Sequence, residues 1–188
     1  MKRILLADDH SIIRLGLIQI LKDEYPSVII KEVSDGAELV KQVTLYDWDL
    51  VISDLDMPGR SGLEALEQIR VLKPALPVLI LSIYPESLYA VRVLKAGGSG
   101  YLNKNSAPED LIAAIHRISL GRKFISPEIA EQLIDIKGDQ PPHEILSNRE
   151  FEVFKLLALG KTLTQIAEIL SLAITTVSTH RSRISCGG

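Results

Sequence analysis

Five short apolar segments alternate with stretches of helical periodicity, and this alternation constrains the fold more than any other feature of the chain. The segments cover residues 4–7, 28–33, 50–54, 77–82 and 100–103. Each is too short for a helix, and turn formers such as Pro58-Gly59 follow them, so each is predicted to be a buried strand. Strands that alternate with helices pair in parallel through right-handed crossovers. Residues 1–120 are therefore predicted to form an α/β domain with a doubly wound five-stranded parallel sheet.

Polar residues end four of these predicted strands or directly follow them. They are Asp8, Asp9, Asp54, Ser82 and Lys104. Taken singly, each has an ordinary explanation as a helix cap, a turn residue or a solvated charge. The carboxyl ends of parallel strands meet at one edge of the sheet, where α/β proteins form their binding sites. We therefore expect these five side chains to form a single site.

The chemistry of this predicted site favours a divalent cation. Three carboxylates at one edge repel each other unless a cation lies between them, and hard oxygen ligands favour Mg²⁺. With the metal and the Lys104 ammonium neutralising phosphoryl oxygens, one carboxylate can act as a nucleophile and become an acyl phosphate. Asp54 is central in the set and is the predicted nucleophile.

The first 120 residues carry motifs that resemble the receiver domain of two-component response regulators, which has a flavodoxin-like fold. The motifs are Asp8-Asp9, Asp54 with Met57-Pro58-Gly59, Ser82, and Gly100-Tyr101-Leu102-Asn103-Lys104. The resemblance implies that Asp54 accepts a phosphoryl group from a histidine kinase, and that Ser82 and Lys104 bind this group. It implies a switch formed by Ser82 and Tyr101. It also implies that Mg²⁺ is bound by Asp8, Asp9, Asp54 and the backbone carbonyl of Asp56.

One position departs from many receivers, because Asn105 stands where they have a proline after the lysine. A cis-proline turn is therefore not assured in this chain.

The second half of the sequence predicts a linker and a small helical domain. Residues 121–143 contain a helix from Pro127 and then a polar segment, 137–143, with two prolines, which is typical of a domain boundary. Ser147 and Glu150 have capping-box spacing, as do Thr162 and Gln165, and a third helix is predicted over 175–184. Residues 144–188 are therefore predicted to form an all-α helix-turn-helix domain, although a protein-binding bundle has the same pattern.

Resemblance favours DNA binding for this second domain. The segments Leu146-Ser147, Arg149-Glu150, Gln165-Ile166-Ala167 and Thr176-Val177, with His180 and Ile184, resemble the LuxR-type DNA-binding domain, and the whole chain resembles the NarL/FixJ class of response regulators. The resemblance implies that promoter DNA is contacted by Thr175, Thr176, Val177, Ser178, His180 and Arg181, and that the protein forms a homodimer.

Three positions depart from the LuxR-type pattern. Ser178 and Thr164 replace residues that are commonly basic, so two phosphate contacts of the family pattern are not assured in this chain. Ala173 replaces a serine that caps the recognition helix, a change that costs about 1 kcal/mol. The chain also ends at Gly188, where the family continues into a fourth helix. We therefore expect an incomplete output domain in which DNA binding is weak or lost.

Composition places few further limits on function. The net charge of -3 provides no global basic field, and the single Cys186 can form no internal disulfide, which fits a reducing cytosol. No signal peptide and no apolar run long enough for a bilayer are evident, so a cytoplasmic protein without membrane association is expected.

A phosphorylation-controlled transcription regulator is thus the predicted function, with self-phosphorylation and slow autodephosphorylation as the only enzymatic activities. The first alternative is a phosphatase of the haloacid dehalogenase type, because Asp54-Leu55-Asp56 is an Asp-x-Asp pair after a strand. Pro58 and the Asp8-Asp9 pair argue against it. The second alternative is a receiver that acts only through protein–protein interaction, with a non-functional output domain.

Overall fold

The computed structural model describes residues 2–135 and 146–186, which fall into two compact units, Met1–Leu133 and Ile134–Gly188. The predicted linker segment 137–143 and the predicted boundary at residue 144 lie outside the described residues.

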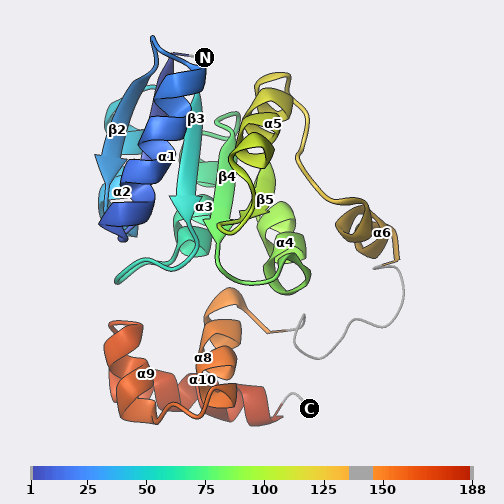
Figure 1. Ribbon diagram of the computed structural model, residues 1–188. Helices are drawn as coiled ribbons and strands as arrows, with labels where there is room; N and C mark the ends of the chain where they lie inside the picture. Colours follow the sequence, from blue (N-terminus) through green and yellow to red (C-terminus); the bar gives the residue numbers. More distant parts are fainter. Residues whose placement is uncertain (1, 136–145, 187–188) are drawn as a thin grey trace. The chain divides into compact units, whose positions relative to one another are not determined.

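The first unit contains the predicted alternation of strands and helices (Figure 1). The strands are β1 Arg3–Ala7, β2 Ile29–Val33, β3 Leu50–Asp54, β4 Val78–Ser82 and β5 Gly100–Asn103. The helices are α1 Ser11–Glu24, α2 Gly36–Leu45, α3 Gly62–Leu72, α4 Glu86–Lys95, α5 Pro108–Ser119 and α6 Pro127–Asp135.

The five strands form one parallel sheet in the order β2-β1-β3-β4-β5. In this order β1 and β3 are neighbours and their carboxyl ends lie side by side, with Ala7 opposite Ser53. The predicted doubly wound sheet is confirmed. Its consequence for the site is that Asp8 and Asp54 come from adjacent strands.

Helices cover the sheet on two faces. Figure 1 shows α1 and α5 in front of the sheet, with α2 and α3 behind it. Alternate strand residues such as Leu6, Ile52 and Leu81 form a core with Leu21 of α1 and Ile115 of α5. Because both faces are covered, β1, β3, β4 and β5 are buried along almost their whole length, whereas the edge strand β2 is buried only at Val33. The buried strands provide a rigid support for the residues at their carboxyl ends.

Glycine at position 62 allows α3 to begin close behind the end of β3. A Cβ atom at this position would overlap the backbone carbonyl oxygen of Asp54, and the Gly62 amide donates to the carbonyl of Leu55 at 2.8 Å. Ser61 and Glu64 then form a capping box that fixes the start of α3. The loop after Asp54 is therefore held tightly against the site.

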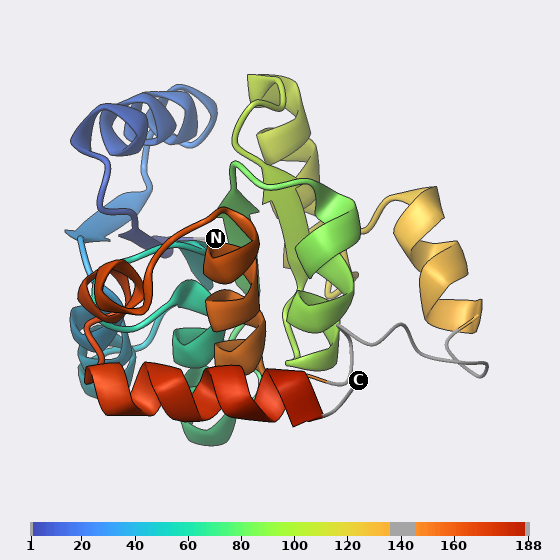
Figure 2. The ribbon, with the colours of Figure 1, turned by 90° about the horizontal axis from the view of Figure 1, so that it is seen from below.

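Over residues 146–186, the second unit contains three short helices, α8 Asn148–Ala158, α9 Leu163–Ile169 and α10 Ile174–Cys186. The predicted capping boxes are present, with Ser147 and Glu150 at α8 and Thr162 and Gln165 at α9. In Figures 1 and 2 alike, α8 lies across α10. A small core holds the three helices together and contains Val153, Leu156, Ile166, Ala167, Leu170 and Val177. This confirms the predicted all-α helix-turn-helix domain.

Among the described residues no peptide bond is cis, so the Lys104–Asn105 bond is trans. No helix of the described part of the chain is long and apolar enough to cross a membrane.

Candidate functional site

A buried pair of carboxylates forms the centre of the site. Asp8 directly follows β1 and Asp54 is the last residue of β3, and their side chains are only 1% and 4% exposed. Asp9, the next residue along the chain, is more open, with 30% of its side chain exposed. The site therefore has a closed end at Asp8 and Asp54 and an open side at Asp9.

Lys104 joins the two buried carboxylates. Its ammonium nitrogen Nζ lies 2.7 Å from Oδ2 of Asp8 and 2.7 Å from Oδ2 of Asp54, and its side chain is 5% exposed. Burial pulls the pKa of Lys104 down, but the hydrogen bonds to Asp54 and Asp8 outweigh this effect and raise the pKa above its ordinary value. Lys104 is therefore a fixed cation at the end of β5.

Burial also changes the acidity of Asp54. Loss of water contact is the main reason that the pKa of Asp54 rises from 3.8 to about 6, and the nearby Asp8 charge raises it further. Lys104 and the amide of Asp56 act in the opposite direction. Burial thus destabilises the ionised form of the Asp54 side chain relative to the protonated form.

The raised pKa of Asp54 predicts a pH-dependent stability in metal-free solution. The folded state holds the Asp54 proton over a range in which the unfolded state has released it, so stability falls as pH rises from about 4 to about 6. The full effect is about 3 kcal/mol at most, since each pKa unit is worth about 1.4 kcal/mol. We expect Asp54→Asn to remove this part of the slope.

Urea unfolding in the presence of a chelator measures this effect, with Trp48, the single tryptophan of the chain, as the fluorescent probe. The wild-type protein and Asp54→Asn are compared at pH 4.5 and at pH 7.5. Equal pH slopes for the two proteins would contradict the assignment of the raised pKa to Asp54.

The donor atoms of the site fit a divalent metal ion. Ligand atoms of Asp8, Asp9, His10 and Asp54 all lie within 4.8 Å of one another. Three carboxylates against one ammonium leave two negative charges, which one divalent cation balances. Carboxylate oxygens with an open side for water are the ligands that Mg²⁺ favours.

Asp56 lies next to this set through its backbone. Its amide donates to Oδ1 of Asp54 at 3.3 Å, and its side chain is half-buried. The loop that contains Asp56 therefore touches the acceptor carboxylate.

Ser82 and Tyr101, the predicted switch residues, are both buried. Ser82 is the last residue of β4, and Tyr101 lies within the neighbouring strand β5. The Ser82 hydroxyl accepts a hydrogen bond from the amide of Tyr84 at 3.2 Å, and the Tyr101 hydroxyl donates to the carbonyl of Tyr84 at 2.9 Å. Burial raises the pKa of Tyr101 to about 12. The segment 82–84 thus links the two residues, and the Tyr101 ring lies inside the protein in this structure.

Sequence reasoning missed one residue of the site. His10 follows the acidic pair directly, and its ring nitrogen Nδ1 lies 2.8 Å from Oδ1 of Asp9. Its position beside Asp8-Asp9 was the available signal, but a lone histidine after acidic residues is unremarkable in a sequence.

The residues predicted to contact DNA differ in their exposure. Thr175, Thr176 and Arg181 of α10 are exposed, whereas Ser178 and His180 are half-buried. Val177 is completely buried in the core of the second unit. This corrects the prediction for Val177, because its side chain has no surface to offer DNA and instead holds α10 against α8 and α9.

The three departures from the LuxR-type pattern lie on or beside α9 and α10. Thr164 is exposed on α9 and Ser178 lies on α10. Ala173 precedes α10, and its carbonyl accepts the amides of Thr176 and Val177 at 3.0 and 3.1 Å. Since alanine has no side-chain oxygen, it provides no side-chain cap to α10.

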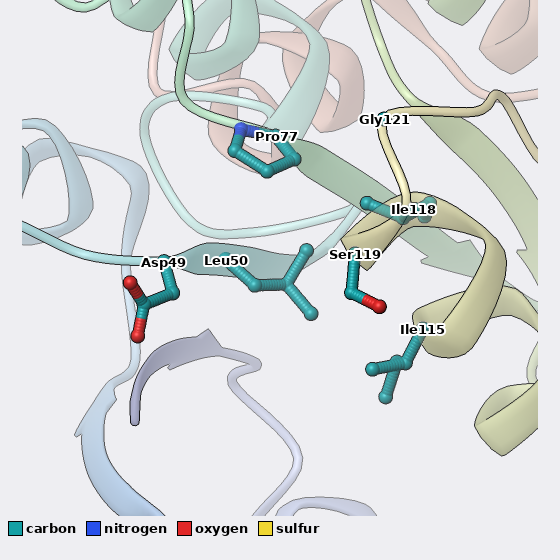
Figure 3. Close-up of a pocket in the computed structure, with 7 residues that line it drawn as sticks. All are labelled: Asp49, Leu50, Pro77, Ile115, Ile118, Ser119 and Gly121. Atoms are coloured by element: carbon teal, nitrogen blue, oxygen red, sulfur yellow. The ribbon is translucent and has the colours of Figure 1, made fainter. Parts of the chain in front are cut away.

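A separate cavity of about 340 Å³ lies at the opposite edge of the sheet (Figure 3). It is lined by Asp49, Leu50, Pro77, Ile115, Ile118, Ser119 and Gly121. Leu50 begins β3 and Asp54 ends it, so the cavity and the acidic site are at the two ends of the same strand.

A doubly wound sheet with a buried acidic pair, a central aspartate and a lysine at its carboxyl edge defines a receiver domain. Two family models match the chain, and one of them agrees with this classification. The model described as "Response regulator receiver domain" matches residues 4–116, and that described as "Bacterial regulatory proteins, luxR family" matches residues 144–185. The chain belongs to the response regulators of two-component systems, in their NarL/FixJ class.

Individual relatives support this assignment over nearly the whole chain. The response regulator UvrY of Escherichia coli K12 is 32% identical over 98% of this chain and 86% of its own length. The oxygen regulatory protein NreC of Staphylococcus carnosus is 34% identical over 97% of this chain and 88% of its own length. The haloacid dehalogenase alternative therefore has no support.

A solved structure is similar in fold. RcsB from Salmonella enterica serovar Typhimurium, bound to promoter rprA in the presence of the phosphomimetic BeF3-, has a TM-score of 0.70 and 26% sequence identity. The match covers 100% of this chain and 92% of RcsB.

Proposed function

We propose that this response regulator accepts a phosphoryl group from a histidine kinase on Asp54 and thereby controls its LuxR-type output domain. The observation that supports this most strongly is the buried cluster in which Lys104 lies 2.7 Å from both Asp54 and Asp8. Both the phosphodonor and promoter DNA require a cytoplasmic location. The proposed domains are a receiver at 1–120, a linker with a helix at 121–143 and the output domain at 144–188.

The chemistry follows from the charges of the site. An oxygen of the Asp54 carboxylate attacks the phosphorus atom, and the bond from phosphorus to the donor breaks, so the leaving group keeps its electron pair. Lys104 pairs with the transferred phosphoryl oxygens, and the Ser82 hydroxyl donates to one of them. When bound by Asp8, Asp9, Asp54 and the carbonyl of Asp56, Mg²⁺ neutralises charge on the phosphoryl group. Self-phosphorylation and slow hydrolysis of the acyl phosphate are the only reactions proposed.

The switch depends on the segment between Ser82 and Tyr84. A phosphoryl group on Asp54 adds close to two negative charges and competes for the Ser82 hydroxyl. Without the phosphoryl group, this hydroxyl accepts a hydrogen bond from the Tyr84 amide. Rotation of this hydroxyl toward the phosphoryl group breaks that bond and releases the segment to which Tyr101 is bonded. The surface over α4, β5 and α5 then repacks, which provides a homodimer or partner surface.

Hydrogen–deuterium exchange tests this coupling. We expect beryllofluoride with Mg²⁺ to change deuterium uptake in peptides that cover residues 82–95 and β5, while peptides of β2 stay the same. Asp54→Asn, which offers beryllofluoride no carboxylate, serves as the control and should show no change. Unchanged uptake over residues 82–103 in the wild-type protein would exclude the proposed switch.

The output domain is proposed to bind promoter DNA weakly, through Thr175, Thr176, Ser178, His180 and Arg181. Positions 164 and 178 carry threonine and serine where the LuxR-type pattern commonly has basic residues, and Ala173 provides no side-chain cap to α10. Arg183 of α10 lies 3.8 Å from Glu150, so part of the available positive charge is neutralised within the domain. Few phosphate contacts mean low affinity and a weak dependence on salt.

Restoring the two basic residues should strengthen binding. We expect Thr164→Lys and Ser178→Lys each to steepen the slope of log affinity against log salt by about one unit, with a gain of roughly tenfold at low salt. Fluorescence anisotropy with DNA from upstream of the protein's own gene measures both quantities.

The matched control is Ser27→Lys, which adds the same charge at an exposed position of the first unit. It should leave the slope unchanged. Tight sequence-specific binding by the wild-type protein at physiological salt, or unchanged slopes in both lysine variants, would refute the proposed weakness.

A further inference from the structure

His10 lies within reach of every carboxylate of the metal site. Its ring nitrogen Nδ1 is 2.8 Å from Oδ1 of Asp9, 3.5 Å from Oδ1 of Asp8 and 3.8 Å from Oδ2 of Asp54. The backbone amide of His10 also donates to Oδ1 of Asp8 at 2.8 Å. The residue is therefore fixed to the site by its main chain and directs its imidazole toward the carboxylates.

A structural role as a helix cap does not account for this position. His10 is the N-cap residue of α1, but its side chain makes no capping hydrogen bond to the helix. About 60% of the side chain is exposed, so packing in the core does not fix the ring either. What holds the imidazole in place is its proximity to the acidic residues.

The distances match those of ligands that share one metal ion. Donor atoms bound at about 2.0–2.2 Å to an octahedral ion lie roughly 3 Å apart when adjacent and roughly 4.2 Å apart when opposite. The three distances from Nδ1 of His10 fall close to this range, and the 4.8 Å limit that encloses the whole set exceeds the separation of opposite ligands by only roughly 0.6 Å. Small ligand movements suffice to place all four residues around one ion.

We infer that His10 is an additional metal ligand, and that it shifts the preference of the site from Mg²⁺ toward Mn²⁺ and other borderline divalent ions. Imidazole nitrogen is a softer ligand than carboxylate oxygen and suits transition metals, whereas Mg²⁺ favours oxygen. A site with three carboxylates alone has no such ligand. This inference rests on the proposed metal site of the receiver and adds a ligand to it.

Pulsed electron paramagnetic resonance of the Mn²⁺-loaded full-length protein tests the ligand directly. A directly bound imidazole gives a nitrogen hyperfine coupling on Mn²⁺. We expect this coupling in the wild-type protein and in His116→Ala, which removes an exposed histidine of α5, and its loss in His10→Ala.

Metal titrations provide the second measurement. In His10→Ala the affinity for Mn²⁺ should fall by roughly tenfold or more, the scale at which changes around a metal site act, while Mg²⁺ affinity stays within about twofold. The more conservative His10→Gln should behave in the same way, and circular dichroism checks that each variant is folded.

The outcomes separate the two claims. If the wild-type protein binds Mn²⁺ and Mg²⁺ but shows no nitrogen coupling, the role of His10 is overturned and the proposed metal site stands. The same conclusion follows if the ratio of Mn²⁺ to Mg²⁺ affinity is the same in His10→Ala as in the wild-type protein. Failure of the wild-type protein to bind either ion at millimolar concentration overturns both the inference and the proposed metal site.

Discussion

Asp54→Asn is expected to remove all of the acid-labile phosphate that acetyl phosphate places on the protein in the presence of Mg²⁺. The amide has no charged oxygen with which to attack phosphorus. Intact-mass spectrometry under mild conditions measures the mass increase of one phosphoryl group.

Asp47→Asn is the matched control for this substitution. It makes the same chemical change at an exposed aspartate before β3, where the carboxylate pairs with Lys73 rather than with the site. It should be phosphorylated as the wild-type protein is. A phosphoryl mass that persists in Asp54→Asn would disprove the assignment of the acceptor.

Chelation of Mg²⁺ is expected to slow phosphorylation by acetyl phosphate by roughly a hundredfold or more, since a metal ion supplies several kcal/mol of charge stabilisation in such reactions. Lys104 compensates only one of the three carboxylates, so an anionic phosphodonor meets two uncompensated negative charges. Initial rates in the presence of a chelator, followed by intact mass, measure the loss.

Added Mg²⁺ in excess of the chelator should restore the rate, whereas sodium chloride at equal ionic strength should not. This control separates specific neutralisation at the site from general screening. An initial rate that does not change on chelation would show that the carboxylates act without a metal.

The sequence was sufficient to predict the fold and the meeting of the site residues. Apolar runs that end in Asp8, Asp54 and Lys104 place these residues at one edge of any parallel sheet, and the structure places the Lys104 ammonium 2.7 Å from both carboxylates. The alternation of strands with helices and the right-handed crossovers between parallel strands determine this geometry. No knowledge of side-chain packing was needed.

Other features required three-dimensional contacts. His10 looked like an ordinary residue after an acidic pair, and only its distances to Asp9 and Asp54 connect it with the metal site. Val177 lies in a predicted recognition helix, but which face of a short helix is buried depends on the packing of α8 and α9. Tyr101 is buried and its hydroxyl donates to the carbonyl of Tyr84, a contact that the sequence pattern does not reveal.

Chemical mapping of the phosphorylated residue tests the central claim most directly. Borohydride reduces an aspartyl phosphate to homoserine, and tandem mass spectrometry of the digested protein then locates the altered residue. We expect homoserine at position 54 after treatment with acetyl phosphate and Mg²⁺, and an unmodified aspartate there when either reagent is omitted. Homoserine at position 8, 9 or 56, with Asp54 unmodified, would contradict the account.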